Sequence, residues 1–270
     1  MLIEEFNSKV GWHNVILIAW IHGNEKSWQI FLEHFSDQLQ KQEIQLRSWT
    51  ITLINYANQR AVEQNVRQTE ENMNRSFVAN NTSQSYEALE AQRIIQILQS
   101  ADVLIDIHDS TTQVTEPFLI SEHSSMNQYF PFQKVVSGLD ILHPWGTDGY
   151  MNSIWKKWFC IECWYFWDAW WESIAQQAVI NVLKKLWNLE WEAQSYEDQE
   201  YFTLDYIYTS KTKSVKLARP FKDFEKIKAW EVLWIDWSEH IFAPYDWVIL
   251  FARETHKPWE EVFVFGKSQS

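Results

Sequence analysis

Two hydrophobic patterns alternate along the first two thirds of the chain. Short apolar runs between polar turns are typical of buried strands, and they occupy residues 14–19, 46–54, 102–108 and 158–163. Apolar residues at helical spacing predict helices over residues 28–42, 86–99 and 172–189. Strands that alternate with helices favour an α/β fold whose sheet is covered by helices on both faces. Ligand sites in such sheets lie at the carboxyl ends of the strands.

Two segments depart from this alternation. Residues 55–82 are polar, rich in Asn, Gln and Arg, and show no period. A loop of that length within a compact domain is usually functional or disordered. After about residue 192 helical spacing disappears, and short strand-like runs follow at 202–208, 214–217, 241–243, 248–251 and 262–265. We therefore predict a catalytic domain over residues 1–192 and a small all-β domain over residues 200–270.

Charge and hydropathy exclude several classes of partner. The formal net charge is −13, so the chain has no electrostatic footprint for nucleic acid or anionic membranes. The longest apolar run, residues 15–21, is too short to cross a bilayer, and the first ten residues do not resemble a signal peptide. We expect a cytoplasmic protein. The sequence leaves open whether it forms a homo-oligomer.

The two cysteines form a C-x-x-C pair, Cys160 and Cys163. This spacing is found in redox and zinc sites. The pair lies within a predicted buried strand, however, where residues three apart face opposite sides. We therefore interpret both as buried thiols.

Three side chains near predicted strand ends have the chemistry of a zinc site. His22 and Glu25 stand three residues apart on a turn that opens a helix, and His108 ends another strand. Two histidines and a glutamate are a standard set for a hydrolytic zinc ion. Asp106 lies on the same strand face as His108 and could orient its ring. An isolated histidine or glutamate of this kind is more often a surface or structural residue than a metal ligand. The metal site is favoured because all three residues lie where the expected sheet would bring them together.

The ordered motifs HGNE, NMNRSF and DIHDS resemble the succinylglutamate desuccinylase/aspartoacylase family. The resemblance runs over the whole chain. It implies a zinc-carboxypeptidase-like fold with a mixed central sheet, and one zinc ion held by His22, Glu25 and His108. It also implies the hydrolysis of an amide bond in a small N-acyl amino acid.

The same resemblance assigns roles to four further residues. Glu162 matches the catalytic glutamate that acts as general base on the zinc-bound water. Arg67 matches the arginine that polarises the scissile carbonyl, a role that suits a guanidinium beside a developing oxyanion. Asn74 and Arg75 match the residues that hold a substrate carboxylate, for which the planar fork of arginine is well shaped.

Two positions depart from the family pattern. Asn58 is followed by Gln59 where many relatives have proline. Asn152 stands where aspartoacylase has a second carboxylate-binding arginine, ten residues before the catalytic glutamate. The second departure argues against a doubly anionic N-acyl-aspartate and leaves another N-acyl amino acid or related amide equally open.

Two alternative functions stay open. One is a zinc carboxypeptidase or cell-wall peptide amidase on the same core. The other is an inactive binding protein whose terminal β domain docks a partner.

The tryptophan content is abnormal, with 18 Trp and only 6 Gly, where average usage predicts about 19 Gly. The family pattern has glycine at Trp20, Trp28 and Trp164. Trp237, Trp247 and Trp259 follow Asp or Pro at turn positions that suit glycine, where we expect a tryptophan to be strained and exposed. In a chain made as written, we expect Trp20 and Trp164 to crowd the zinc pocket. Some bacteria read the codon UGA as glycine, and a standard translation would print it as Trp. Our hypothesis is that many tryptophans are glycines in a bacterial source, and the candidates are Trp20, Trp28, Trp164, Trp230, Trp234, Trp237, Trp247 and Trp259.

Overall fold

The computed structural model describes residues 1–8, 11, 13–25, 27–110, 116–122, 124–163, 169–186, 188–189 and 192–269. Within these ranges the side chains of residues 27–30, 124, 169–172 and 175 are not described. Trp164, and the side chain of Trp28, therefore lie outside the described part of the chain.

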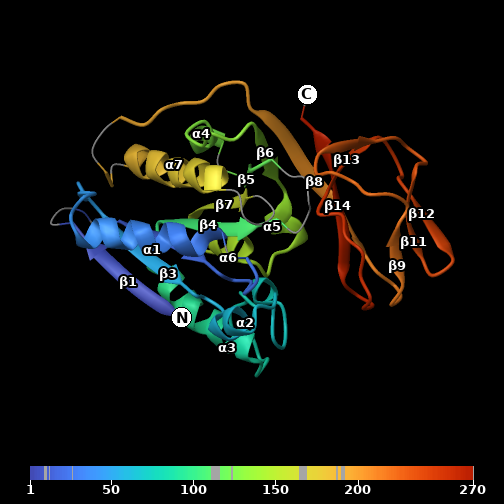
Figure 1. Cartoon of the computed structure of the whole chain (residues 1–270), viewed down its shortest axis with the longest axis horizontal. Coiled ribbons are helices and arrows are strands. Elements are labelled where there is room, and N and C mark those ends of the chain that lie inside the picture. Colours follow the sequence, from blue (N-terminus) through green and yellow to red (C-terminus); the bar gives the residue numbers. More distant parts are fainter. Residues whose placement is uncertain are drawn as a thin grey trace.

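The described strands form one large mixed sheet and one small antiparallel sheet (Figure 1). The order across the large sheet is β1-β3-β2-β4-β7-β5-β6-β8-β14-β13-β10. Its first seven strands are β1 (Leu2–Asn7), β2 (Asn14–Ala19), β3 (Thr50–Asn55), β4 (Val103–Asp109), β5 (Phe118–Ile120), β6 (Lys134–Ser137) and β7 (Lys157–Cys163). Strands β3, β2, β4 and β7 are parallel neighbours, whereas β1 and β5 run antiparallel to β3 and β7. The predicted mixed α/β fold is confirmed.

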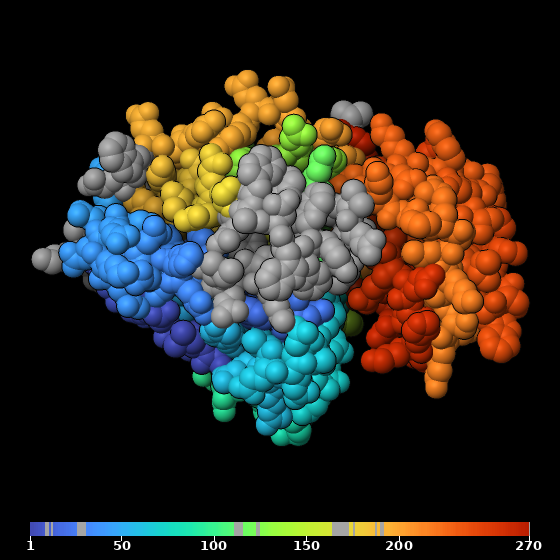
Figure 2. Space-filling view, viewed as in Figure 1, coloured from blue at the N-terminus to red at the C-terminus, as the bar shows by residue number. Residues whose placement is uncertain are grey.

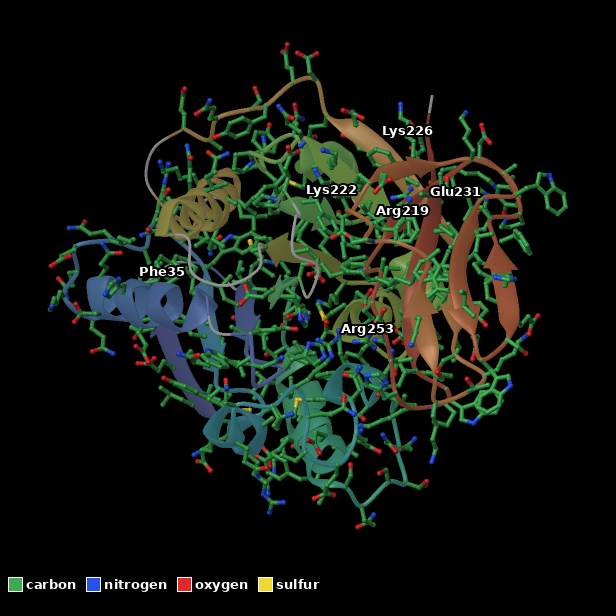
Figure 3. The ribbon with its side chains drawn as sticks, turned by 45° about the vertical axis from the view of Figure 1, so that its right-hand side comes forward. Phe35, Arg219, Lys222, Lys226, Glu231 and Arg253 are labelled. Carbon is green, nitrogen blue, oxygen red and sulfur yellow. The ribbon has the colours of Figure 1, made fainter. Side chains whose placement is uncertain are left out.

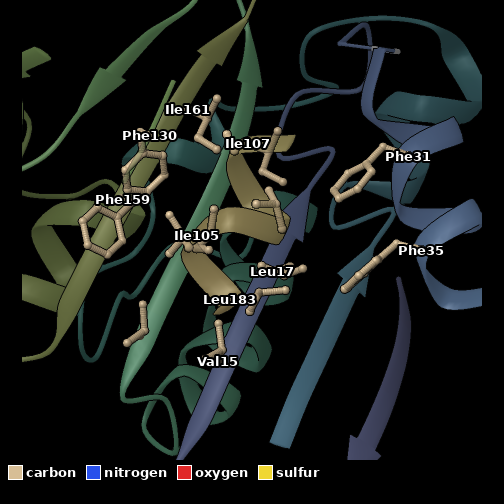
Figure 4. Packing of buried hydrophobic residues seen from close by; sticks show 14 of the residues in the cluster. Val15, Leu17, Phe31, Phe35, Ile105, Ile107, Phe130, Phe159, Ile161 and Leu183 are labelled. Carbon is tan, nitrogen blue, oxygen red and sulfur yellow. The ribbon is translucent and has the colours of Figure 1, made fainter. Parts of the chain in front are cut away.

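Helices cover both faces of the sheet because the central strands are apolar on both sides. Val15 and Leu17 face one hydrophobic cluster, whereas Ile16 and Ile18 face another. The first cluster packs beneath α1 (Ser27–Gln40) and α7 (Ala169–Lys185), and Figure 4 shows Phe31 and Phe35 there beside Leu17. The other helices are α2 (Gln59–Gln64), the 3-10 helix η1 (Met73–Arg75), α3 (Tyr86–Leu98), α4 (Ser124–Asn127), α5 (Leu139–Leu142) and α6 (Thr147–Ser153). None of the described helices combines the length and the hydrophobicity that a membrane crossing requires.

The polar stretch 55–82 is more ordered than its lack of period predicts. It contains α2 and η1, and Asn58 caps α2 by accepting a hydrogen bond from the Ala61 amide at 3.3 Å. Gln59 is therefore the first helical residue, which is the position where proline is also favoured. This explains why the departure at Gln59 leaves the local fold intact.

The strands after residue 192 continue the central sheet. β8 (Glu200–Thr209) pairs with β6 and with β14 (Glu261–Ser268), which is followed by β13 (Trp247–Leu250) and β10 (Glu225–Ile227). The small sheet consists of β9 (Val215–Leu217), β11 (Val232–Asp236) and β12 (Glu239–Phe242). The region is all-β in its described part, and its cluster is built from residues such as Leu233, Trp234 and Phe263. A domain boundary near residue 192 stays a prediction.

Six tryptophans in the described part of the chain have a backbone conformation that favours glycine. Trp20, Trp230, Trp237 and Trp259 have φ between 63° and 67°, in the left-handed region that favours glycine. Trp49 and Trp155 lie in the same region, with φ of 71° and 59°. Trp230, Trp237 and Trp259 are also about three-quarters exposed, at 76%, 75% and 77%.

Two expectations about individual tryptophans are wrong. Trp247 does not occupy an exposed, strained turn: it begins β13, is buried, and packs against Tyr206 and Phe265. Trp20 does not crowd the expected metal site, because its ring turns into the core and stacks on Tyr56, with the ring centroids 5.8 Å apart. Trp234, another candidate, is fully buried in β11 and stacks on Phe263 at 3.9 Å.

Candidate active site

Three parallel strands place the chemistry at one edge of the sheet. β4 lies between β2 and β7, and the register pairs Ala19 with Ile107 and His108 with Glu162. His22 and Glu25 follow β2 at the same edge. The turn that carries them requires Gly23, since a Cβ atom there would lie 2.1 Å from the Ala61 carbonyl carbon. The predicted convergence at the strand ends is therefore present in the structure.

His22, Glu25 and His108 form a buried cluster. The two oxygens of Glu25 lie 2.7 Å from Nδ1 of His22 and 2.9 Å from Nδ1 of His108. The ring centroids of the histidines are 5.1 Å apart. One ligand atom from each of the three residues lies within 4.8 Å of the others.

The opposite ring nitrogens of the two histidines also have partners. Nε2 of His108 lies 3.1 Å from Oδ2 of Asp106, which in turn accepts a hydrogen bond from the Thr147 hydroxyl. Nε2 of His22 lies 2.9 Å from Oδ1 of Asn72. Asp106 was expected beside His108, whereas Asn72 was not foreseen. Such contacts fix the rings so that Nδ1 of each points at the shared centre.

Burial and charge perturb all three groups. Burial, followed by the nearby Arg67 charge, lowers the pKa of His22 to about 4. Burial opposes ionisation of Glu25 and His108, but the two histidines hold the pKa of Glu25 well below its usual value. Asp106 and Glu25 raise the pKa of His108 well above its own. Two imidazoles and a carboxylate, buried and converging, fit the ligand set of a divalent metal.

Glu162 enters the same pocket from β7. The pocket has a volume of about 100 Å³ and is also lined by His22, Glu25 and His108. Burial raises the pKa of Glu162 to about 8. Its neighbours Cys160 and Cys163 are buried and pack on opposite sides of the sheet, as interpreted from the sequence.

The polar segment 65–82 lines another side of the pocket. Arg67 donates from Nη1 to Oε1 of Glu25 at 2.9 Å. Asn74 accepts a hydrogen bond from the Thr147 amide at 3.1 Å, which fixes its carboxamide. Figure 2 shows this segment, in cyan, and the red C-terminal strands on either side of a hollow.

Arg75 reaches the pocket but already has a carboxylate partner. Its Nε and Nη2 donate to Glu261 of β14 at 2.8–3.0 Å, and Nε2 of His143 lies 3.2 Å from the same carboxylate. Burial alone would raise the pKa of Glu261. His143 and Arg75 outweigh burial and hold this pKa well below its usual range. The expected substrate contact of Arg75 is thus occupied by a side chain of the C-terminal strands.

Several lining residues were not foreseen from the sequence. His143, Arg253 and Glu261 come from segments with no motif, so only their place in the fold identifies them. Asn72 had a signal, since it is the first residue of the NMNRSF motif. Asn152, which stands where aspartoacylase has a second arginine, is exposed and donates to Asp140 at 2.7 Å.

Comparisons with solved structures give the same architecture. The succinylglutamate desuccinylase of Vibrio parahaemolyticus superposes with a TM-score of 0.80 at 13% identity, covering 98% of this chain and 86% of the other. The succinylglutamate desuccinylase of Chromobacterium violaceum gives 0.74 at 18% identity, covering 97% and 86%. The product-bound ectoine utilization protein EutE (DoeB) of Ruegeria pomeroyi gives 0.73 at 16% identity, covering 98% and 88%. At such identities these matches establish the fold alone.

Sequence comparison supplies the family. No curated protein shows significant similarity to this chain. The family model described as succinylglutamate desuccinylase/aspartoacylase catalytic domain matches residues 12–152, just over half of the chain. The matched region contains His22, Glu25, Arg67 and His108. On this evidence the chain belongs to the succinylglutamate desuccinylase/aspartoacylase family of hydrolases.

Proposed function

We propose that this protein is a zinc-dependent amidohydrolase that releases the amino acid from a small N-acyl amino acid. His22, Glu25 and His108 would hold one zinc ion per chain. Bound zinc supplies Lewis acidity and lowers the pKa of a coordinated water toward about 7. Asp106 orients His108 for this role through its contact with Nε2.

Glu162 is the general base in this proposal. It is buried, lines the same pocket as the three ligands and is paired in register with His108. A carboxylate in that place takes a proton from the attacking water and returns it to the leaving amine. Burial raises the pKa of Glu162 to about 8, and the positive charge of a bound zinc ion would lower it toward the range in which one carboxyl group can both accept and return a proton.

The polar segment binds and polarises the substrate. Arg67 presents its guanidinium beside Glu25, where it can stabilise negative charge that develops on the scissile carbonyl oxygen. Asn74 and Arg75 would hold a substrate carboxylate, with Glu261 yielding or sharing the fork of Arg75. The proposed setting is cytoplasmic, with a small molecule as the partner.

One observation carries the proposal: three buried ligand side chains and a buried carboxyl group converge on one pocket at the carboxyl ends of three parallel strands. The test is the substitution Glu162→Gln, which keeps size and removes the base. We expect kcat on N-acyl amino acids to fall by about 10²–10⁴-fold while the zinc content is unchanged. Glu239→Gln, an exposed carboxylate that pairs with Lys211, is the matched control and should keep full activity.

Product analysis separates this activity from the alternatives. The proposal predicts one free amino acid and one carboxylic acid per turnover. Trimming of a residue from a peptide would instead identify a carboxypeptidase or peptide amidase. Purified protein without zinc, and without any activity that Glu162→Gln abolishes, would identify a binding protein.

A further inference from the structure

Three arginines line the pocket, and they come from two distant parts of the chain. Arg67 and Arg75 belong to the polar segment of the core, whereas Arg253 follows β13 near the C-terminus. In Figure 3, Arg253 lies where the C-terminal strands meet the core, apart from the group formed by Arg219, Lys226 and Glu231. The C-terminal strands thus contribute a cation to a site whose metal ligands all lie in the core.

Two of these arginines are neutralised by protein carboxylates. Arg67 forms an ion pair with Glu25 at 2.9 Å, and Arg75 forms a two-pronged pair with Glu261 at 2.8 Å. Such forked pairs are among the stronger hydrogen-bonded contacts in proteins. A substrate carboxylate must displace or share a protein carboxylate to use either guanidinium.

Arg253 differs in this respect. Its Nε donates to the backbone oxygen of Glu261 at 2.9 Å, and its amide donates to the Val262 carbonyl at 2.9 Å. No carboxylate among the described residues forms an ion pair with it, and neither Nη atom has an acceptor there. The bond at Nε fixes the plane of the guanidinium and leaves the other edge of the fork for a ligand.

The guanidinium of Arg253, in these surroundings, destabilises the folded protein when no ligand is bound. Burial, and then the Arg67 charge, lower the pKa of Arg253 from its usual value, and Arg75 adds to the effect. The charges of Glu261 and Glu260 offset part of this lowering, but neither forms an ion pair with Arg253, so a ligand carboxylate would stabilise the partly buried cation. Perturbed charges of this kind gather at functional sites.

We propose that Arg253 determines specificity by binding a second carboxylate of the substrate, in addition to the one at Arg75. This inference rests on the proposed amidohydrolase function. It means that the arginine missing at position 152 is replaced from the C-terminal strands, so a doubly anionic substrate is accepted after all. The second carboxylate belongs either to the acyl group or to the side chain of the amino acid.

The test compares matched substrates that differ in one carboxylate. N-succinylalanine against N-butanoylalanine probes the acyl side, and N-acetylaspartate against N-acetylasparagine probes the amino-acid side. We expect the zinc-loaded wild type to prefer the dicarboxylate in one pair, which identifies the source. In Arg253→Gln, kcat/KM for that dicarboxylate should fall about 10- to 100-fold, at least tenfold more than for its monocarboxylate partner. Arg253→Lys should recover only part of the loss, because lysine lacks the planar fork.

Arg219→Gln is the matched control. Arg219 lies in the same C-terminal region and pairs with Glu225 and Glu231 outside the pocket, so its loss should leave both substrates unaffected. The zinc content of Arg253→Gln should match the wild type, and its thermal melt should occur at or above the wild-type temperature, because the substitution removes a partly buried cation that forms no ion pair. Equal losses on both members of each pair, or no preference in the wild type, would overturn the role of Arg253 and leave the amidohydrolase intact. No hydrolysis of any of the four by zinc-loaded wild type would instead overturn the proposed function itself.

Discussion

Asp148, in α6, carries a carboxyl group that the fold removes from solvent. Burial raises its pKa to about 7, and its Oδ2 has no hydrogen-bond partner among the described residues. The folded protein therefore binds a proton that the unfolded chain releases above its ordinary pKa near 4. Stability conferred by the neutral form is full below that value and is lost as the pH rises toward 7.

The substitution Asp148→Asn should remove this pH dependence. We expect the variant to gain stability relative to the wild type by about 1.4 kcal/mol per pH unit between pH 4 and pH 7, and no further above pH 7. Denaturant unfolding at pH 4.5, 6 and 7.5 measures the difference. A constant difference at all three values would show that Asp148 is ionised in the folded protein.

Trp230, Trp237 and Trp259 test the glycine hypothesis. Each is largely exposed and has φ between 63° and 67°. Glycine adopts that backbone without the penalty of about 1 kcal/mol that a side chain incurs, although its greater freedom in the unfolded chain offsets part of the gain. The triple substitution to glycine should stabilise the protein by about 1–2 kcal/mol in total, measured by denaturant unfolding.

Two further measurements test the glycine hypothesis: the stability after substitution of a buried tryptophan, and the codons of the gene. Trp234→Gly should destabilise by about 3–5 kcal/mol, because the indole is fully buried and stacked on Phe263. Stabilisation there would extend the glycine hypothesis to the core of the C-terminal strands. UGG codons at Trp20 and Trp237 would contradict the hypothesis outright.

Glu87, in the first turn of α3, anchors the segment that carries the polar site residues. Its carboxylate accepts hydrogen bonds from the Thr69 amide and hydroxyl, both at 2.6 Å, and from the Glu70 amide at 3.2 Å. Asn58 also donates to it, at 3.4 Å. One buried carboxylate therefore ties α3 to α2 and to the chain that leads into η1.

Glu87→Gln should loosen this segment without touching the metal ligands. We expect kcat/KM to fall about tenfold and stability by about 1–3 kcal/mol, because the acceptor loses its charge and one of its two oxygens becomes an NH2 group that cannot accept. Zinc content should stay at the wild-type level. Glu63→Gln, an exposed carboxylate that accepts from Gln59 on α2, is the control. An unchanged kcat/KM in Glu87→Gln would mean that the segment holds its place by other contacts.

The elements that the sequence predicts well are those with a strong period. β2 and α3 agree with their predicted bounds within a residue, since long apolar runs and stripes dominate locally. β5 and β6, with three and four residues, carry too little pattern to find, and α2 is too short and too polar. The continuation of the sheet through β8 was missed because strand order depends on partners far away in the sequence.

The residues that line the pocket also divide into those with a local sequence signal and those without one. His22, Glu25 and His108 stand at strand ends or in motifs, so their convergence followed from the expected parallel sheet. Arg253 and Glu261 have no motif and reach the pocket only because β14 returns beside β8. Side chains that a second region contributes to a site leave no local trace in the sequence.

Across the whole molecule, one sheet connects the proposed metal ligands to the C-terminal strands. β7 carries Glu162, β6 pairs with β8, and β14 supplies Glu261 at the pocket. In the proposed function, substrate recognition is therefore shared between the core and the C-terminal strands, whereas the chemistry belongs to the core alone. We expect substitutions in the C-terminal strands mainly to change which N-acyl amino acid is accepted. They should have less effect on the activation of water.

The most direct test of the central claim is the release of free amino acid from N-acyl amino acids by chelated protein, before and after zinc is added back. We predict that chelation abolishes release, and that about one equivalent of zinc per chain restores it, with one carboxylic acid formed for each amino acid. Release that persists at full rate in metal-free protein, or zinc-loaded protein that hydrolyses none of these substrates, would contradict the account.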